Sequence, residues 1–392
     1  MHRKLDSVTM IGTAYSRYGN KPFGIWLADR MQHIYILGQT GTGKSTLLYH
    51  LMRQDLGQGH GFCLIDPHGD LAEQIAGSCP ETALTWNVAD PNCPFGYNPL
   101  THVSDQFRPL IASGLIDTLK KQWADAWGAR MEHILRYALL ALLEQPKTDL
   151  RDIMRLFLDK TFQKEVVARV TDEQVHQFWV REFPSMNYKT AFDGVAPIAN
   201  KLGAFLAHPV VRRALTAPEE PLRFRKIMDE GQILIVNLAK GQLGSDIANV
   251  LGGMILSGFA HAAFSRHTIP ETDRCPYFLH VDEFQVFTTG ALADMVSELR
   301  KYGLSLTLAN QYLGQIEPTI LDALLGNAGT LMCFRVSPND ALYVARHLDG
   351  PEVSDLIAVP NYRMFVRLMV EGERSKSFTA WGGCTLNNSV LL

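Results

Sequence analysis

Eight consecutive residues, Gly38 to Ser45, have the types and spacing needed to bind a chain of phosphates. They read GQTGTGKS and match the pattern G-x-x-x-x-G-K-[ST], between an apolar run and a helix predicted from Thr46 to Leu56. Glycines allow the backbone to wrap phosphates with its N–H groups inward, and the start of the helix adds a partial positive charge. The segment therefore predicts a P-loop.

Two side chains of this loop have expected roles in chemistry. Lys44 would reach the β- and γ-phosphates, and Ser45 would ligand Mg²⁺. The alternative is a chance glycine-rich turn before a structural helix, which the matching flanks disfavour. The motif indicates ATP or GTP without deciding between them. The residues expected to contact the nucleotide are Gly38, Gln39, Thr40, Gly41, Thr42, Gly43, Lys44, Ser45 and Thr46.

A pair of acids, Asp282 and Glu283, ends a second apolar run, YFLHVDEF at residues 277–284. Asp282 could hold Mg²⁺ through its water shell, and Glu283 could orient and deprotonate an attacking water. One carboxylate would suffice for binding, so the tandem pair favours hydrolysis. The simpler alternative is a strand end capped by two solvated acids.

A third apolar run, in the segment LRKYGLSLTLANQY at residues 299–312, ends on two carboxamides. A strand here would lie beside the strand that carries the acids, with its carboxyl end facing the γ-phosphate. We expect Gln311, rather than Asn310, to sense phosphate or hold the lytic water. The alternative is a polar strand end that bonds its own loop.

Arg300 ends a helix predicted over residues 290–302, with Gly303 as its stop. It could simply favour the helix dipole. It could instead reach the γ-phosphate of a neighbouring subunit and stabilise the transition state, in which case the active form is a ring. Arg335 and Arg346 are the reserve candidates for this role.

Apolar runs alternate with helical patterns around these motifs, which predicts an α/β fold: a RecA-like P-loop NTPase core with a mainly parallel sheet. An all-α insertion interrupts this core. The predicted strands are 33–37, 61–66, 83–88, 232–238, 276–282, 304–309 and 329–336, with a terminal hairpin of 362–370 and 374–381.

Between residues 101 and 225 the strand pattern gives way to helical periodicity. Thr171 and Gln174 suggest a capping box there. One predicted helix face carries Met131, Ile134, Leu135, Ala138, Leu139 and Leu142. The predicted domains are 1–100, the first part of the core; 101–225, the insertion; and 226–392, the second part with the acids, Gln311 and the hairpin.

The composition is that of a folded protein, with 46% hydrophobic and 20% charged residues. The net charge of -3 excludes a global basic field, so any DNA contact must be local. The six cysteines form no C-x-x-C pair, which fits a reduced compartment. The apolar run 247–264 contains polar and small residues and is expected to pack inside the protein. We therefore expect a cytoplasmic protein without a membrane segment of its own.

Taken in order, the motifs IYILGQTGTGKST, LIDPHGD, FGYNPL, FLHVDEF and LRKYGLSLTLANQY resemble those of the HerA/FtsK superfamily of ring-forming DNA motors. Within it, the chain looks most like the cytosolic motor core of type IV conjugative coupling proteins. The helical block from WGARMEHILRYALLALLE and the segment RKIMDEGQILIVNLAKG also look like that branch. The resemblance covers roughly residues 20 to 385, and the ordered set of motifs is more specific than the P-loop alone.

The resemblance implies an ATP-hydrolysing translocase that uses Mg²⁺ and threads double-stranded DNA through the pore of a homo-hexamer. It gives Arg300 the role of the trans-acting arginine. It also puts Asp66, His68 and Asp70 on the loop beside the P-loop, where they are expected to orient the nucleotide site rather than bind a metal. The residues that inherit the roles given above are Lys44, Ser45, Asp282, Glu283 and Gln311. Pore candidates, for each of which an ordinary solvated charge is the favoured interpretation, are Lys240, Arg223, Arg225 and Lys226.

Two departures from the family keep other functions open. Coupling proteins usually carry N-terminal membrane helices, and HerA proteins an N-terminal β-barrel that docks a nuclease; we expect neither here. The chain could be a ring that scaffolds or regulates an effector such as a nuclease in antiviral defence. It could also be a type IV secretion ATPase that moves protein, or a switch with negligible turnover. A relaxase-type partner is a further possibility.

Overall fold

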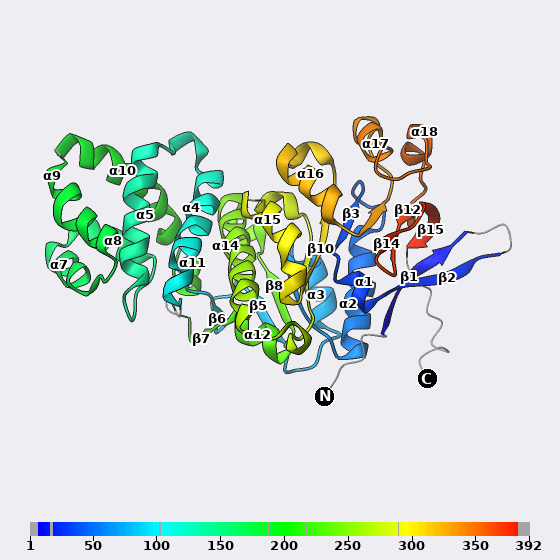
Figure 1. The fold of residues 1–392 in the computed structure, drawn as a ribbon, viewed down its shortest axis with the longest axis horizontal. Helices are drawn as coiled ribbons and strands as arrows, with labels where there is room; N and C mark the ends of the chain where they lie inside the picture. The colour runs from blue at the N-terminus through cyan, green and yellow to red at the C-terminus, as the bar shows by residue number, and fades with distance from the viewer. Residues whose placement is uncertain are drawn as a thin grey trace. The chain divides into compact units, whose positions relative to one another are not determined.

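The computed structural model describes residues 7–15, 19–101, 103–186, 188–216, 218–288 and 290–382. The chain divides into two compact units, whose elements are labelled in Figure 1. The predicted boundaries at residues 100 and 225 remain a proposal for how the domains divide. The first unit comprises Met1–Thr85, Arg225–Asn237 and Ala263–Leu392, and the second comprises Trp86–Phe224 and Leu238–Ala262.

Among the described residues, an 11-stranded sheet organises the first unit. The strand order is β2 (Lys21–Trp26), β1 (Val8–Ala14), β15 (Phe378–Gly382), β12 (Arg363–Arg367), β11 (Thr330–Cys333), β3 (Ile34–Leu37), β10 (Leu304–Asn310), β9 (Tyr277–Val281), β4 (Gly61–Asp66), β8 (Leu234–Asn237) and β5 (Leu84–Asn87).

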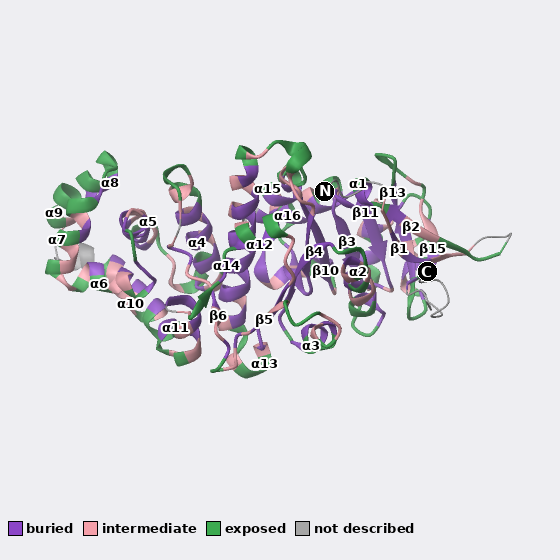
Figure 2. Ribbon diagram, turned by 90° about the horizontal axis from the view of Figure 1, so that it is seen from below, coloured by how far each residue is buried: buried purple, intermediate pink, exposed green. Residues whose placement is uncertain are grey.

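The central strands run parallel and are covered on both faces. β3 pairs in parallel with β10 and β11, and β9 pairs in parallel with β10 and β4. Every residue of β3, β9, β10 and β4 is buried, as Figure 2 shows in purple, which accounts for their nearly continuous apolar sequences. The predicted α/β fold with a mainly parallel sheet is confirmed.

Two helices, α2 (Lys44–Gln58) and α3 (Asp70–Ala76), cover one face of this sheet. Leu47 and Leu51 of α2 share a hydrophobic cluster with Ile36 and Phe62 of the strands. Helix α2 begins at Lys44, two residues before the predicted Thr46, because helical geometry starts directly after the glycine of the loop.

The sequence patterns missed two antiparallel strands at one side of the sheet, β1 and β2, which pair with each other and, through β1, with β15. Glycines lie in both strands because their neighbours come close. A Cβ on Gly12 would lie 2.1 Å from the carbonyl oxygen of Trp381, and one on Gly24 would lie 2.6 Å from that of Thr9. Glycine inside a strand weakens the apolar alternation by which strands are recognised.

The predicted terminal hairpin is present but divided. β12 pairs with β15, and β13 (Met369–Val370) pairs with β14 (Glu373–Arg374). The turn falls at Glu371 and Gly372, as expected, and both have positive φ. The carboxylate of Asp29 accepts both of their backbone N–H groups, at 2.8 and 2.9 Å, and so ties the turn to the unit.

A buried ion pair lies beneath α2. The guanidinium of Arg30, in α1 (Leu27–Arg30), donates to both carboxylate oxygens of Asp55 in α2, at 2.5 and 2.8 Å. It also stacks 3.7 Å from the ring centroid of Phe278 in β9. His280, also in β9, lies 3.2 Å from the second oxygen of Asp55. The pair therefore links α1, α2 and β9 in the interior.

The other helices of the first unit follow the strands. They are α12 (Phe224–Glu230), α15 (Gly290–Glu298), α16 (Pro318–Asn327), α17 (Pro338–Val344) and α18 (Val353–Ile357). Short 3-10 segments span Ser265–Thr268, Glu271–Asp273, Phe284–Phe287, Leu299–Tyr302 and Leu313–Gln315. The helix predicted over 290–302 is thus α15 followed by a 3-10 turn, and it stops at Gly303, which has φ of 73°.

The second unit is mainly helical. Its helices are α4 (Arg108–Gln122), α5 (Ala129–Leu143), α6 (Arg151–Leu158), α7 (Lys160–Arg169), α8 (Glu173–Gln177), α9 (Phe183–Ser185), α10 (Tyr188–Ala207), α11 (Pro209–Thr216), α13 (Lys240–Leu243) and α14 (Ser245–Phe264), with a π-helical turn at Phe178–Glu182 and 3-10 turns at Asp105–Phe107 and Ala124–Ala126. All six residues of the predicted apolar face of α5 are buried.

Two details of this unit correct the sequence prediction. The N-cap of α8 is Asp172, whose side chain accepts from the N–H of Val175, and not Thr171, which instead bonds the carboxylate of Glu144. A two-residue strand, β7 (Glu220–Pro221), lies in the span predicted to be free of strands and pairs with β6 (Phe95–Gly96). So short a strand leaves no periodicity to recognise.

Helix α14 contains the most apolar run of the chain. The helical span Ser245–Thr268 is long and apolar enough to cross a membrane, yet 72% of its apolar window is buried within the protein. Its small residues allow close packing against α4, because a Cβ on Gly253 would lie 2.8 Å from Thr118 and one on Gly114 only 2.3 Å from Ser257. The run behaves as the core helix that the sequence predicts.

Breaking the buried pair should destabilise the fold strongly. Asp55→Asn leaves the guanidinium of Arg30 buried without a counter-charge, at a cost of about 3–5 kcal/mol. Replacing both partners, Arg30→Met with Asp55→Leu, should recover much of this loss. Urea unfolding followed by circular dichroism measures these changes. Glu298→Gln, which breaks the exposed pair with Lys301, is the control and should cost less than about 0.5 kcal/mol. An Asp55→Asn cost no larger than the control would contradict the prediction.

The same pair gives a pH dependence. Burial alone would raise the pKa of Asp55, but the charge of Arg30 and hydrogen bonds from His280, His60 and Arg30 together lower it. A carboxylate with a lowered folded pKa stabilises the fold above its unfolded pKa of about 3.9 and loses this contribution as pH falls further. The stability gap between the wild type and Asp55→Asn should therefore narrow below about pH 4.

Candidate functional site

The P-loop is held at the carboxyl end of β3 by the strands on either side. The N–H of Gly38 donates to the carbonyl of Asn310, at the end of β10, over 3.2 Å. The N–H of Gln39 donates to the carbonyl of Arg335, just beyond β11, over 2.9 Å. Two neighbouring strands therefore fix where the loop starts.

Glycines give the loop its shape. Gly41 has φ of 76° and Gly43 has φ of 120°, a region in which other residues are strained. Gly43 is also crowded, because a Cβ there would lie 3.0 Å from the ring of Tyr362 and 3.2 Å from that of Phe334. The loop conformation thus requires glycine at this position for two separate reasons.

Lys44 starts α2 and lies back over the loop. Its ammonium donates to the carbonyl oxygens of Gly38, at 2.7 Å, and Gln39, at 3.2 Å. Burial lowers the pKa of Lys44, while the charges of Asp282 and Glu283 oppose that shift. A phosphate entering the loop would give this ammonium a charged partner in place of carbonyl oxygens.

Asp282 follows β9 directly and faces the P-loop helix. The hydroxyl of Ser45 donates to one carboxylate oxygen over 3.2 Å, and the N–H of Glu283 donates to the other over 3.0 Å. Burial, with the negative charges of Glu283 and Asp66, raises the pKa of Asp282 to about 6. A bound cation would offset this crowding of negative charge.

The pair of oxygens on Ser45 and Asp282 fits Mg²⁺. Adjacent ligands of an octahedral Mg²⁺, each about 2.1 Å from the metal, lie about 3 Å apart, close to the 3.2 Å between these two oxygens. Both are hard oxygen donors, which Mg²⁺ prefers. Asp282 and Ser45 can therefore hold the ion directly or through its water shell.

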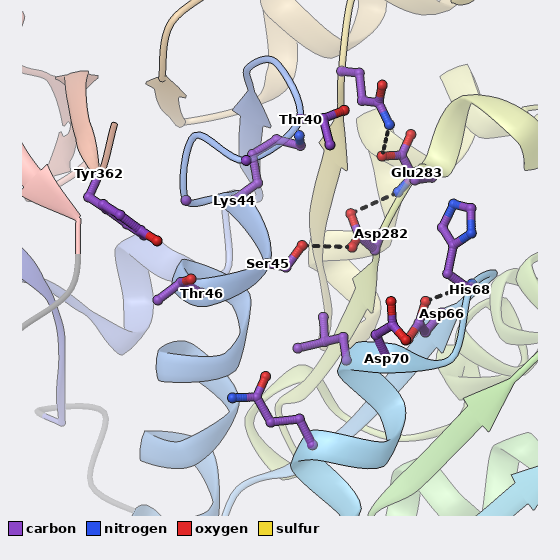
Figure 3. Close-up of a pocket in the computed structure, with 15 residues that line it drawn as sticks. Thr40, Lys44, Ser45, Thr46, Asp66, His68, Asp70, Asp282, Glu283 and Tyr362 are labelled. Atoms are coloured by element: carbon purple, nitrogen blue, oxygen red, sulfur yellow. Dashed lines mark hydrogen bonds between the residues drawn. The ribbon is translucent and has the colours of Figure 1, made fainter. Parts of the chain in front are cut away.

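Glu283 is held at both carboxylate oxygens by carboxamides. The Nε2 group of Gln311 donates to Oε1 over 2.6 Å, drawn as a dashed line at Glu283 in Figure 3. The Nε2 group of Gln285 donates to Oε2 over 2.5 Å. The backbone of Glu283 has φ of 49° and ψ of 43°, a left-handed conformation that aims its side chain into the pocket. Gln285, in the turn after the acids, had no sequence signal beyond its position two residues after Glu283.

The two carboxamides that end β10 separate in space. Asn310 is buried, accepts from the hydroxyl of Tyr35 over 2.8 Å and donates to the carbonyl of Tyr312 over 3.0 Å. Gln311 lines the pocket and bonds Glu283. Asn310 therefore shapes the strand end, and Gln311 is the carboxamide that faces the site.

Sheet register explains why these distant residues meet. Leu37 of β3 pairs with Asn310 of β10, and Val281 of β9 pairs with Ile65 of β4. Parallel strands in register end at the same edge, so the residues that follow them form one cluster. The P-loop, the two acids, Gln311 and Asp66 all leave the sheet there.

The loop DPHGD after β4 lies against the same pocket. Both carboxylate oxygens of Asp66 accept backbone N–H groups, from His68 and Ala72, each at 2.9 Å. Asp66 thus orders the loop and the start of α3, while the exposed His68 and Asp70 line the pocket. The pocket has a volume of about 340 Å³, which is in the range of small-molecule sites.

The predicted arginines fall in different places. Arg300 is exposed and precedes β10, whereas Gln311 follows it, so seven strand residues, about 20 Å, separate them. Arg300 therefore lies near the amino end of the central parallel strands, opposite the P-loop of its own chain. Arg335 donates to the side-chain oxygen of Gln39 over 3.2 Å. Arg346 is exposed beyond α17.

The predicted pore cations show ordinary surroundings. Arg225 donates to Asp229 over 2.5 Å, and Lys226 lies 3.7 Å from Glu230, both within α12. Lys240 begins α13 in the second unit. These contacts leave the pore assignment a proposal.

The family model described as the type IV secretion-system coupling protein DNA-binding domain matches residues 24–201. A sequence search of curated proteins gave no match.

Solved structures share the fold. The bacterial conjugative coupling protein TrwBdeltaN70, in its unbound form, aligns with a TM-score of 0.68 at 17% identity, over 92% of this chain and 86% of that chain. TrwB in complex with ADP and Mg²⁺ gives 0.65 at 17%, over 91% and 86%. VirB4 of Thermoanaerobacter pseudethanolicus gives 0.66 at 14%, over 97% and 98%. The predicted resemblance to the HerA/FtsK superfamily, and within it to the coupling-protein motor core, is confirmed.

A pair of glycine substitutions tests the loop geometry. Gly43→Ala should weaken ATP binding more than tenfold, because its Cβ meets Tyr362 and Phe334 at a positive φ. Gly57→Ala, inside α2 with nothing within 4 Å of the new Cβ, should bind ATP normally and gain about 0.5–1 kcal/mol of stability. Calorimetric titration and thermal unfolding measure both. Normal ATP binding by Gly43→Ala would show that the loop geometry described here is not the binding geometry.

Proposed function

We propose that this chain, a P-loop protein of the HerA/FtsK class, is an ATP-hydrolysing motor that translocates double-stranded DNA through a hexameric ring in the cytoplasm. One observation carries the hydrolytic part: the tandem acids after β9 meet the P-loop, with Asp282 bonded to Ser45 and Glu283 bonded to Gln311. A site that only bound nucleotide would not need the second carboxylate.

The chemistry follows from the positions of these side chains. The P-loop N–H groups and Lys44 bind the phosphates. Ser45 and Asp282 would hold Mg²⁺, which would supply neutralisation of the phosphate charge. Glu283 takes a proton from the attacking water, while Gln311 orients that water and the Glu283 carboxylate. If Gln311 turns from Glu283 toward the γ-phosphate, one carboxylate oxygen of Glu283 becomes free to accept the proton of the water.

DNA as the substrate is supported by the matched coupling-protein DNA-binding domain, which spans residues 24–201. The net charge of -3 is compatible with it, because a pore needs cations only on its inner loops, and a ring repeats each of them. Lys240 and the group Arg223, Arg225 and Lys226 remain the candidates for phosphate contacts.

A ring is supported by the position of Arg300. It lies near the amino end of the central strands, away from its own P-loop, and is exposed, so it cannot serve the γ-phosphate of its own chain. A neighbouring subunit that presents its P-loop edge to this arginine would complete the site. The role of a trans-acting arginine is therefore assigned to Arg300, with Arg335 and Arg346 in reserve.

A second candidate function is a type IV secretion ATPase that moves protein. The structural alignment with VirB4, which covers 97% of this chain and 98% of that chain, supports this second candidate. An ATPase ring that regulates an effector, such as a nuclease in antiviral defence, shares the same core. Both alternatives predict ATP hydrolysis that is indifferent to DNA.

Steady-state ATP hydrolysis with and without linear double-stranded DNA tests the proposal. We expect DNA to stimulate the rate, Lys44→Ala to abolish it, and Glu283→Gln to bind ATP while hydrolysing it about 10²–10⁴-fold more slowly. Undiminished turnover by Glu283→Gln would refute the catalytic assignment. If the rate depends on Lys44 but DNA leaves it unchanged, the protein-moving or regulatory ATPase is favoured over the DNA translocase.

Mixing two inactive variants tests the arginine in trans. Arg300→Ala keeps its own P-loop, and Lys44→Ala keeps its arginine, so a mixed ring contains sites with both intact elements. We expect the mixture to recover part of the wild-type rate, whereas each variant alone stays near the background. Full activity of Arg300→Ala alone, or no recovery on mixing, would remove Arg300 from the active site. Lys301→Ala, beside it and also exposed, is the control and should hydrolyse ATP at the wild-type rate.

A further inference from the structure

We propose that the ring of Tyr362 is the platform on which the nucleotide base stacks. The inference rests on the proposed function for the phosphate end of the pocket and adds the position of the base. Tyr362 lies at the end of the turn that precedes β12, far from the P-loop in sequence, and no sequence motif pointed to it.

The order of side chains across the pocket fixes which end receives the base. In Figure 3, Glu283 and Asp282 lie on one side, Ser45 and Thr46 follow at the start of α2, and Tyr362 lies on the other side. The γ-phosphate belongs beside Glu283, where the attacking water is activated. The phosphate chain then runs along the start of α2, so the nucleoside leaves the loop near Thr46, on the side of Tyr362.

Tyr362 is the aromatic ring available at that end. Of the described residues that line the pocket, only His68 also has an aromatic ring, and it lies near Asp66 at the acidic side. Tyr362 is 44% exposed, although its ring packs beside Gly43. A large aromatic surface left open at the mouth of a nucleotide pocket can cover the face of a base.

The backbone conformation that holds this ring in place is unfavourable. Tyr362 has φ of 62°, a left-handed conformation that is unfavourable for a residue with a side chain. Its N–H donates to the carbonyl of Thr42 in the P-loop over 2.7 Å, and its carbonyl accepts from the N–H of Gly382 over 2.8 Å. Strained residues persist where the surroundings determine them, and they concentrate at functional sites. Here the two hydrogen bonds hold Tyr362 in the strained conformation and so keep its ring beside the P-loop.

Stacking predicts a particular dependence on the base. A ligand that keeps the three phosphates but lacks the nucleoside, inorganic tripolyphosphate, should not depend on the ring. ATP should, because an aromatic platform gains affinity from the flat face of a base. Comparing these two ligands separates the base subsite from the phosphate site.

The experiment is calorimetric titration of the full chain with MgATP and with magnesium tripolyphosphate. Tyr362→Gly removes the ring and relieves the positive φ, so the turn is preserved, and Tyr362→Phe keeps the ring without its hydroxyl. Trp26→Ala removes a similarly exposed aromatic side chain, 45% exposed, from β2 and is the control. Thermal unfolding checks that each variant is folded.

We expect Tyr362→Gly to raise the dissociation constant for ATP by about 5- to 150-fold and to leave that for tripolyphosphate unchanged. Tyr362→Phe and Trp26→Ala should bind both ligands as the wild type does. Unchanged ATP affinity in Tyr362→Gly would overturn the proposal. An equal loss for both ligands would also overturn it, because Tyr362 would then act on the P-loop through Thr42.

If the proposed function is wrong, the titrations will give a different result. In that case the wild type itself would bind neither ligand, or Lys44→Ala would bind both as well as the wild type does. The base platform and the phosphate site are therefore tested by separate comparisons within one set of titrations.

Discussion

The buried pair of Arg30 and Asp55 is the interaction on which the geometry of the site depends. Asp55 lies in α2, which begins with Lys44 and Ser45, and its carboxylate also meets His280 in β9, two residues before Asp282. The pair therefore fastens the helix that starts the phosphate site to the strand that ends in the acids. A fully buried ion pair is costly to desolvate and gains its attraction only in good geometry, so it tolerates little displacement between these elements.

Sheet register then determines which side chains share the pocket. β3, β10, β9 and β4 are parallel neighbours, and their carboxyl ends and the segments that follow contribute Lys44, Gln311, Glu283 and Asp66. The electrostatic effect of this clustering is seen at Asp282, where burial and two neighbouring acids raise the pKa of the carboxyl group to about 6. Such a concentration of negative charge is favourable only beside a cation, which links the electrostatics of the fold to the need for Mg²⁺ and for Lys44.

Patterns in the sequence were sufficient for the central sheet, since buried parallel strands read as continuous apolar runs, and for the motifs that follow them. They did not reveal β1 and β2, where Gly12 and Gly24 interrupt the alternation to admit neighbouring backbone. They also could not show that Tyr362 lines the pocket or that Gln285 bonds Glu283, because nothing local marks either residue. Tyr362 reaches the P-loop only through pairing of β12 with β11 and β15, contacts between segments far apart in sequence. The buried Arg30–Asp55 pair was hidden for the same reason.

A residue with a strained, left-handed backbone lies at each end of the pocket. Glu283 and Tyr362 both have positive φ, and each is secured by partners from other segments: Glu283 by Gln311, and Tyr362 by the backbone of Thr42 and Gly382. Left-handed geometry in such residues costs about 1–3 kcal/mol each, which the rest of the fold must offset. The strain at Glu283 is offset partly by contacts with Gln311, a residue expected to respond to the γ-phosphate. The strain at Tyr362 is offset by the P-loop backbone itself. A change in the phosphate site can therefore alter the support of both residues, so that the catalytic and nucleoside ends of the pocket are mechanically connected through the loop between them.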